Sequence, residues 1–98
     1  MTTPDDLRAA ARRARAEATE LRTLAAGLDH SHVHELTRLG GDSTWVGPSA
    51  SLFQAAVDRG RQEIGWAAAD LRRAGTLLDQ EASDLDRAAA RAALAAAV

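Results

Sequence analysis

Apolar residues recur every seven positions through two long stretches of the chain. The row in the first stretch is Leu7, Ala14, Leu21 and Leu28. The row in the second stretch is Val57, Ile64, Leu71, Leu78, Leu85 and Ala92. Because seven residues make about two turns of an α-helix, each row lies along one side of a helix. The pattern predicts two long amphipathic helices, over about residues 4–39 and 48–95, that pack along these rows.

The boundaries of both helices carry recognisable signals. Thr3 can cap the first helix, Pro4 suits its first position, and Asp5 and Asp6 complement the positive end of the helix dipole. After Leu28 the apolar spacing changes, so the last third of this helix is expected to fray or kink. In the second helix the residues expected to let a neighbouring backbone come close are Gly60, Ala67 and Ala74.

A polar stretch of about residues 40–48 separates the two helices. Gly40 and Gly41 can end a helix, and Pro48 can begin the next one. The chain is therefore expected to double back here into an antiparallel two-helix hairpin. Trp45 lies inside the turn, where its indole either closes the end of the hairpin or faces a partner. Gly47 precedes a proline, which favours extended backbone and a role in capping or close approach.

The turn and its surroundings resemble a known family. A chain of about a hundred residues in which two helices flank a W-x-G turn, with a Phe soon after and no cysteine, is similar to the WXG family. These are the ESAT-like helical hairpins of type VII secretion systems. Three residues match the motif itself, namely Trp45, Gly47 and Phe53.

The resemblance implies a secreted protein that acts by protein–protein recognition. Its partners would be another hairpin of the family and then the membrane ATPase of the secretion system. The family's Y-x-x-x-D/E export signal is not matched, since Leu78 and Ala82 stand at its two positions and the chain has no Tyr. The chain is therefore expected to be the unmarked member of a heterodimer, or else a relative that stays inside the cell.

Composition agrees with a single all-α domain over residues 1–98. Ala is abundant and aromatic residues make up only 3% of the chain, so two helices alone would bury little apolar area. Leu24, Trp66, Leu77 and Leu94 fall off the main rows and need another surface. We therefore expect two hairpins to associate into a four-helix bundle, as a homo- or heterodimer. Trp66 with Leu77 is either an outer contact for the partner or the rim of the hairpin itself.

Charge and residue usage exclude several classes of partner. The net charge is −2 and both signs are interspersed, so neither nucleic acid nor membrane insertion is favoured. No apolar run of signal-peptide length follows the N-terminus, so any export is expected to use a leaderless route from a cytoplasmic pool. All twelve basic residues are Arg, which indicates a GC-rich genome such as that of an actinobacterium.

The remaining polar groups suggest little chemistry. His30, His32 and His34 lie close together, but two imidazoles on one helix face are too few for a metal site. An intracellular metal- or pH-responsive regulator that uses His30 and His34 is the alternative to the secretion hypothesis. The first-helix arginines are expected to form a solvated face, namely Arg8, Arg12, Arg15 and Arg22. We find no nucleophile with a base and no cofactor fingerprint, so we expect no enzyme and no cofactor.

Overall fold

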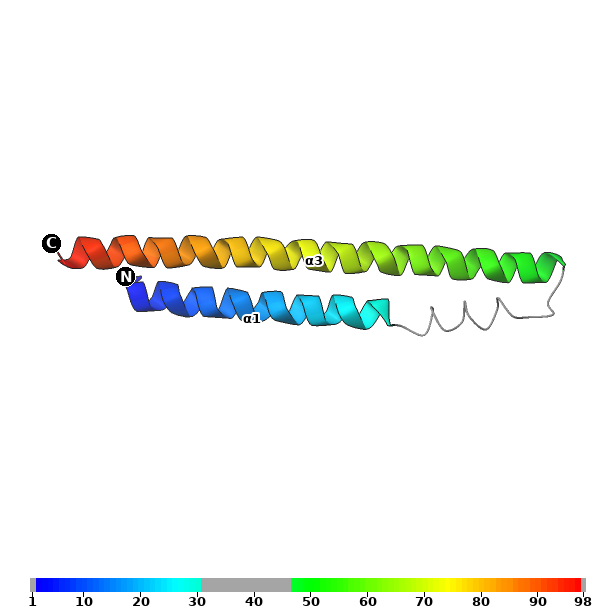
Figure 1. The fold of residues 1–98 in the computed structure, drawn as a ribbon, viewed down its shortest axis with the longest axis horizontal. Helices are drawn as coiled ribbons and strands as arrows, with labels where there is room; N and C mark the ends of the chain where they lie inside the picture. The colour runs from blue at the N-terminus through cyan, green and yellow to red at the C-terminus, as the bar shows by residue number, and fades with distance from the viewer. Residues whose placement is uncertain (1, 31–46, 98) are drawn as a thin grey trace.

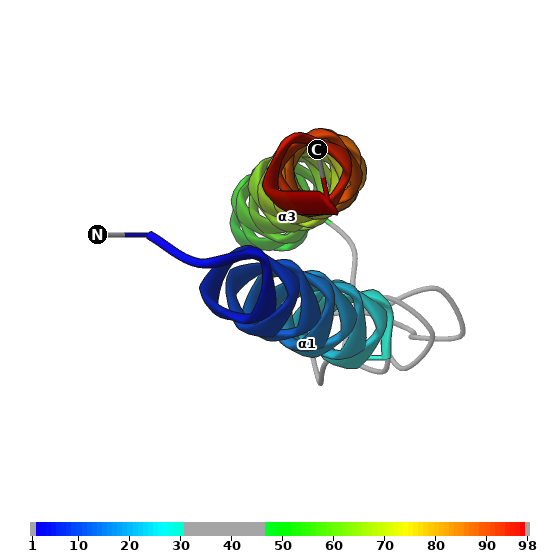
Figure 2. The ribbon, with the colours of Figure 1, turned by 90° about the vertical axis from the view of Figure 1, so that its left-hand side faces the viewer.

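The computed structural model describes residues 2–30 and 47–97, and within these residues the protein is entirely helical. Helix α1 spans Pro4–Asp29 and helix α3 spans Pro48–Ala97. The two helices lie side by side in an elongated molecule of 77 × 17 × 14 Å (Figure 1). The view along the long axis shows the two described helices beside each other (Figure 2). The predicted all-α class and the packing of two helices against each other are confirmed.

The start of α1 follows from its first residues. The Thr3 hydroxyl accepts a hydrogen bond from the Asp6 N–H, and the Asp6 carboxylate accepts one from the Thr3 N–H, each at 3.1 Å. This reciprocal capping box satisfies two backbone donors that have no partner inside the helix. Pro4 occupies the first helical position, where a missing N–H costs nothing.

The other end of α1 lies at Asp29. His30 caps it and donates its N–H to the carbonyl oxygen of Ala26 at 3.3 Å. The sequence predicted a helix to about residue 39 and a turn to about residue 48. Residues 31–46, which include most of that turn, lie outside the described residues.

Helix α3 begins directly after Gly47. The carbonyl oxygen of Gly47 accepts a hydrogen bond from the Ser51 N–H at 3.2 Å, as expected of a residue that caps a helix. Its φ of +108° lies where only glycine is unstrained, and this accounts for the residue type. No described atom lies within 4 Å of the position that a Cβ would take, so close approach is not its role among the described residues.

The two helices run antiparallel, with the start of α1 beside the C-terminal part of α3 (Figure 1). The contact between them is lined by small residues on both sides. The buried residues of α1 are Ala11, Ala14, Ala18 and Ala25, and those of α3 are Val57, Ala68, Gly75, Ala82 and Ala89. No described large side chain is fully buried. The interior of this hairpin is therefore a strip of alanine and glycine.

The two backbones come close together at Gly75. A Cβ built at Gly75 would lie 3.4 Å from the carbonyl oxygen of Ala18. The sequence placed this close approach at Gly60, Ala67 and Ala74, and that assignment is wrong for Ala67, which is exposed. The residues of α3 that pack closely against α1 include Ala68 and Gly75, each one residue later than the predicted Ala67 and Ala74.

Candidate interaction surface

Three ion pairs join α1 and α3 along one flank of their contact. Arg15 Nη2 lies 2.6 Å from Asp86 Oδ2. Arg22 pairs with Asp79, and Asp29 pairs with Arg72. Both helices contribute a residue at every seventh position, in opposite chain directions. We call these three contacts the ion-pair row.

The ion-pair row corrects one sequence-based expectation. Arg15 and Arg22 were expected to belong to a solvated face, but the structure places both at the helix contact. Their side chains remain 47% and 45% exposed, so the guanidinium groups reach across the rim of the contact and not into an interior. Arg8 instead pairs with Asp5 on its own helix, at 3.1 Å.

The residues predicted to line the helix contact are buried or half-buried. Leu7, Leu21 and Leu28 of α1 are half-buried, as are Ile64, Leu71, Leu78 and Leu85 of α3, while Val57 is buried. Leu78 and Leu85 pack against a cluster that consists of Ala11, Ala14 and Ala82. The larger side chains therefore flank the alanine strip and shield it from water.

Large apolar side chains are exposed on the outside of the hairpin. Trp66 is 61% exposed and Leu77 is 59% exposed, both on α3. They are eleven residues apart, which is close to three full turns, so they share one side of the helix. The other exposed large side chains are Leu24 of α1 and Leu52 and Leu94 of α3.

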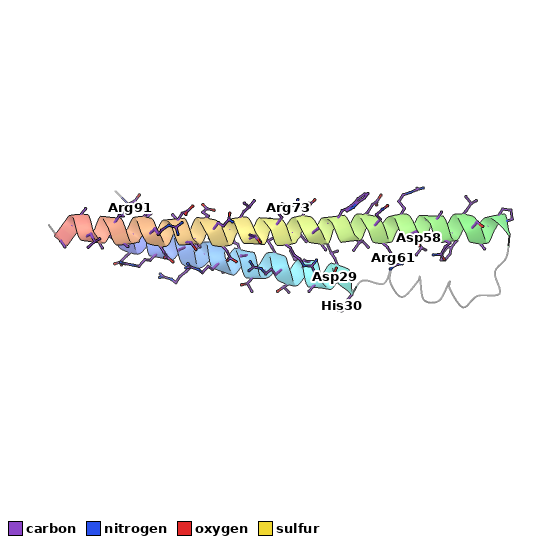
Figure 3. All side chains as sticks on the ribbon, turned by 45° about the horizontal axis from the view of Figure 1, so that its top comes forward. Asp29, His30, Asp58, Arg61, Arg73 and Arg91 are labelled. Atoms are coloured by element: carbon purple, nitrogen blue, oxygen red, sulfur yellow. The ribbon has the colours of Figure 1, made fainter. Side chains whose placement is uncertain are left out.

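Arginines alternate with these apolar residues along the outer side of α3. Leu52, Trp66 and Leu94 are separated by multiples of fourteen residues, and the seven-residue positions between them are occupied by Arg59, Arg73, Gln80 and Arg87. Figure 3 shows Arg73 on the side of α3 that faces away from α1. Within the described residues, Arg73 and Arg87 each pair with an Asp three residues earlier on their own helix. The outer side of α3 thus carries apolar and basic residues that no described part of the chain covers.

The predicted turn motif is only partly described. Trp45 lies outside the described residues, so its predicted role remains a prediction. Gly47 caps α3, and Phe53 is half-buried in the second turn of that helix. The structure therefore places two of the three motif residues at the same end of α3.

The histidines provide no described metal site. His30 is exposed at the end of α1, close to Asp29 (Figure 3). His32 and His34 lie outside the described residues. Within residues 2–30 and 47–97, no three side chains of the types that bind metals come together. Two surface depressions lie along α3, one next to Asp58 and Arg61 and the other next to Asp79 and Ser83, and both are wide open to solvent.

Two features of the contact were not found from the sequence. One is the alanine row of α3, and the other is the ion-pair row. A signal for both exists in the seven-residue spacing of Ala68, Gly75, Ala82 and Ala89 and of Arg72, Asp79 and Asp86. Its meaning depends on the alignment of α3 with α1, which the sequence does not provide.

Comparison of the chain with protein-family models, with curated proteins and with solved structures finds no match. Neither of the two described helices has a stretch long and apolar enough to cross a membrane. The argument for function therefore depends on the surface of the hairpin.

Proposed function

We propose that this protein is a binding module whose helical hairpin pairs with a second helical hairpin, a copy of itself or a different chain. The observation that carries the proposal is the distribution of side-chain size. The contact between α1 and α3 buries alanine and glycine, whereas Trp66 and four leucines are exposed.

Free energy favours covering these residues. Burial of a Leu or Trp side chain contributes about 1.5–3 kcal/mol, much more than burial of an alanine. In a hairpin with so small an interior, most of the available hydrophobic stabilisation remains on the outside. A four-helix assembly of two hairpins would cover the outer side of α3 and supply what the single hairpin lacks.

The outer pattern also indicates what the partner offers. Exposed Trp and Arg are the residue types that most often dominate binding energy at protein interfaces. Apolar residues that alternate with Arg59, Arg73 and Arg87 fit a partner helix with carboxylates between its own apolar residues. Recognition of this kind requires no catalytic group.

The resemblance to the WXG family extends this proposal to secretion. Two antiparallel helices fit the hairpin of that family, and Gly47 and Phe53 occupy the expected end of α3. In this hypothesis the protein is the member of a type VII secretion pair that lacks its own Y-x-x-x-D/E signal. It would leave the cell with a marked partner, and its export would stop when the membrane ATPase of the system is deleted.

The test is the mass of the purified chain at micromolar concentration, measured by sedimentation equilibrium. We expect either a dimer or a loosely helical monomer that gains a cooperative melting transition when the second hairpin is added. Replacement of Trp66 and Leu77 together by Ala should weaken the association at least 30-fold, the effect of losing one strong contact residue.

A matched control replaces Thr76 and Gln80, which are also exposed on α3 but are neither apolar nor basic, by Ala. This variant should change the dissociation constant by less than about fivefold. The proposal is wrong if the chain alone melts cooperatively as a monomer, with both indoles protected from a soluble fluorescence quencher.

A further inference from the structure

The apolar contact between α1 and α3 does not define its own alignment. Ala18 lies opposite Gly75 in the structure. If α3 moved by seven residues relative to α1, Ala18 would lie opposite Ala68 or Ala82 instead. Small residues would still face small residues in both cases, because both rows repeat every seven positions. A contact of this kind tolerates displacement by one heptad.

The ion-pair row does not repeat in the same way. Along α1 the charges are positive at Arg15 and Arg22 and negative at Asp29. Their partners on α3 have the opposite signs. Two pairs therefore have their arginine on α1, and the third pair, Asp29 with Arg72, is reversed.

This reversal penalises displacement in either direction. A shift by one heptad one way places Arg22 opposite Arg72. A shift the other way places Asp29 opposite Asp79. The first shift replaces three attractive contacts by two attractive ones and one repulsive one, because Arg8 would then face Asp86. The second shift leaves one attractive and one repulsive contact. Charges that flank an apolar contact are a general means of selecting helix alignment.

The position of Asp29 supports a role of this kind. It is the last residue of α1, where the negative end of the helix dipole favours a basic side chain. No basic residue occupies this last turn. An acid here opposes the local preference of the helix, so its benefit comes from the contact with Arg72.

Pairing between identical helices satisfies the same charges less well. Two copies of α1, antiparallel and centred on this row, would place Arg22 against Arg22 between two contacts of Arg15 with Asp29. Two copies of α3 would place Asp79 against Asp79 between two contacts of Arg72 with Asp86. All three contacts are attractive only when an α1 meets an α3 in the observed alignment.

We propose that the reversed pair Asp29–Arg72 fixes the alignment of α1 against α3. This inference goes beyond the proposed function, and its test needs the single chain only.

Disulfide trapping can report the alignment, because the chain has no cysteine of its own. Ala25→Cys with Ala68→Cys reports the observed alignment. These two positions lie one heptad along from the opposed pair Ala18 and Gly75, so they also face each other in the antiparallel hairpin. Ala18→Cys with Ala68→Cys reports one shifted alignment, and Ala18→Cys with Ala82→Cys reports the other. Peptide mapping after mild oxidation gives the yield of each disulfide within one chain.

The decisive background is the double variant Asp29→Arg with Arg72→Asp. It keeps three attractive pairs in the observed alignment and removes the repulsive contact from both shifted ones. We expect the yield of the two shifted disulfides to be about fivefold higher than with the native charges. This figure follows because each altered charge contact changes the yield by about two- to fivefold. The rise should disappear in 1 M salt, where the screening length is about 3 Å.

The matched control is Arg15→Asp with Asp86→Arg. It also keeps three attractive pairs, but every charge contact of each shifted alignment becomes repulsive, so the shifted yields should stay at or below those of the native charges. The proposal is overturned if the two double variants give equal shifted yields. That outcome would mean that the connection between the helices alone sets their alignment.

Discussion

Helix α3 packs small residues on its inner side and exposes large apolar residues on its outer side, which is the reverse of what a compact protein usually shows. The inner side places Ala68, Gly75 and Ala82 against α1, and the outer side exposes Trp66 and Leu77. Typical proteins bury their largest apolar residues first. Here the distance between two backbones selects the inner residues, because only small side chains allow the approach seen at Gly75.

The two sides of α3 therefore have different roles. The inner side determines the geometry of the hairpin, and dispersion contacts between closely packed backbones stabilise it. The outer side holds most of the surface that can still be removed from water. Substitutions on the inner side should therefore change folding, and substitutions on the outer side should change association.

The largest effect is expected from added bulk on the inner side. Gly75→Leu places a side chain where a Cβ alone would lie 3.4 Å from the Ala18 carbonyl oxygen. It should lower the free energy of unfolding by about 3 kcal/mol. The control is Gly65→Leu, since no described atom lies within 4 Å of a Cβ at Gly65. This second variant should gain about 0.5–1 kcal/mol from helix propensity. Urea denaturation followed by circular dichroism measures both, and equal effects would remove the distinction between the two sides.

A smaller effect is expected from the neighbouring residues Leu77 and Leu78. Leu78 is half-buried and packs on the alanine cluster, whereas Leu77 is 59% exposed. Leu78→Ala should destabilise the packing of α1 against α3 by about 2 kcal/mol at every protein concentration. At the lowest concentration, Leu77→Ala should change it by less than about 0.5 kcal/mol. Thermal melts at several protein concentrations check this, because the cost of Leu77→Ala should increase only when the chain associates.

The smallest effect on stability is expected from the ion-pair row, which lies at the edge of the contact between α1 and α3. Arg22→Ala removes one contact of the ion-pair row and should cost about 0.5 kcal/mol at low salt. Arg73→Ala removes a pair within one exposed turn and should cost close to nothing. Urea denaturation in 20 mM and in 1 M salt measures the free energy of unfolding of both variants and distinguishes them. A cost for Arg22→Ala that does not change with salt would contradict an electrostatic origin.

Local signals in the sequence predicted the helices well. Thr3, Pro4 and Asp6 form a start signal that needs no tertiary information, and α1 begins at Pro4. The half-buried row from Ile64 to Leu85 was also predicted, because large apolar residues at intervals of seven stand out from their neighbours. The sequence left Trp66 open between an outer contact and the rim of the hairpin, and the structure exposes it.

The alanine row of α3 and the ion-pair row could not be predicted in the same way. Alanines occur on every side of both helices, so Ala68 and Ala82 look no different in the sequence from Ala67 or Ala90. Arg15 and Asp86 are 71 residues apart, and only the alignment of the helices brings them together. Local propensity and periodicity contain no information about that alignment.

The shape of the molecule has a consequence for how it opens. In a rod 77 Å long and one helix pair wide, each residue touches only neighbours at its own level. Local openings in such a structure start at the ends and propagate inward, much as in repeat proteins. Amide protons near the middle of the α1 and α3 contact should therefore exchange most slowly, with protection that declines towards Pro4 and Ala97.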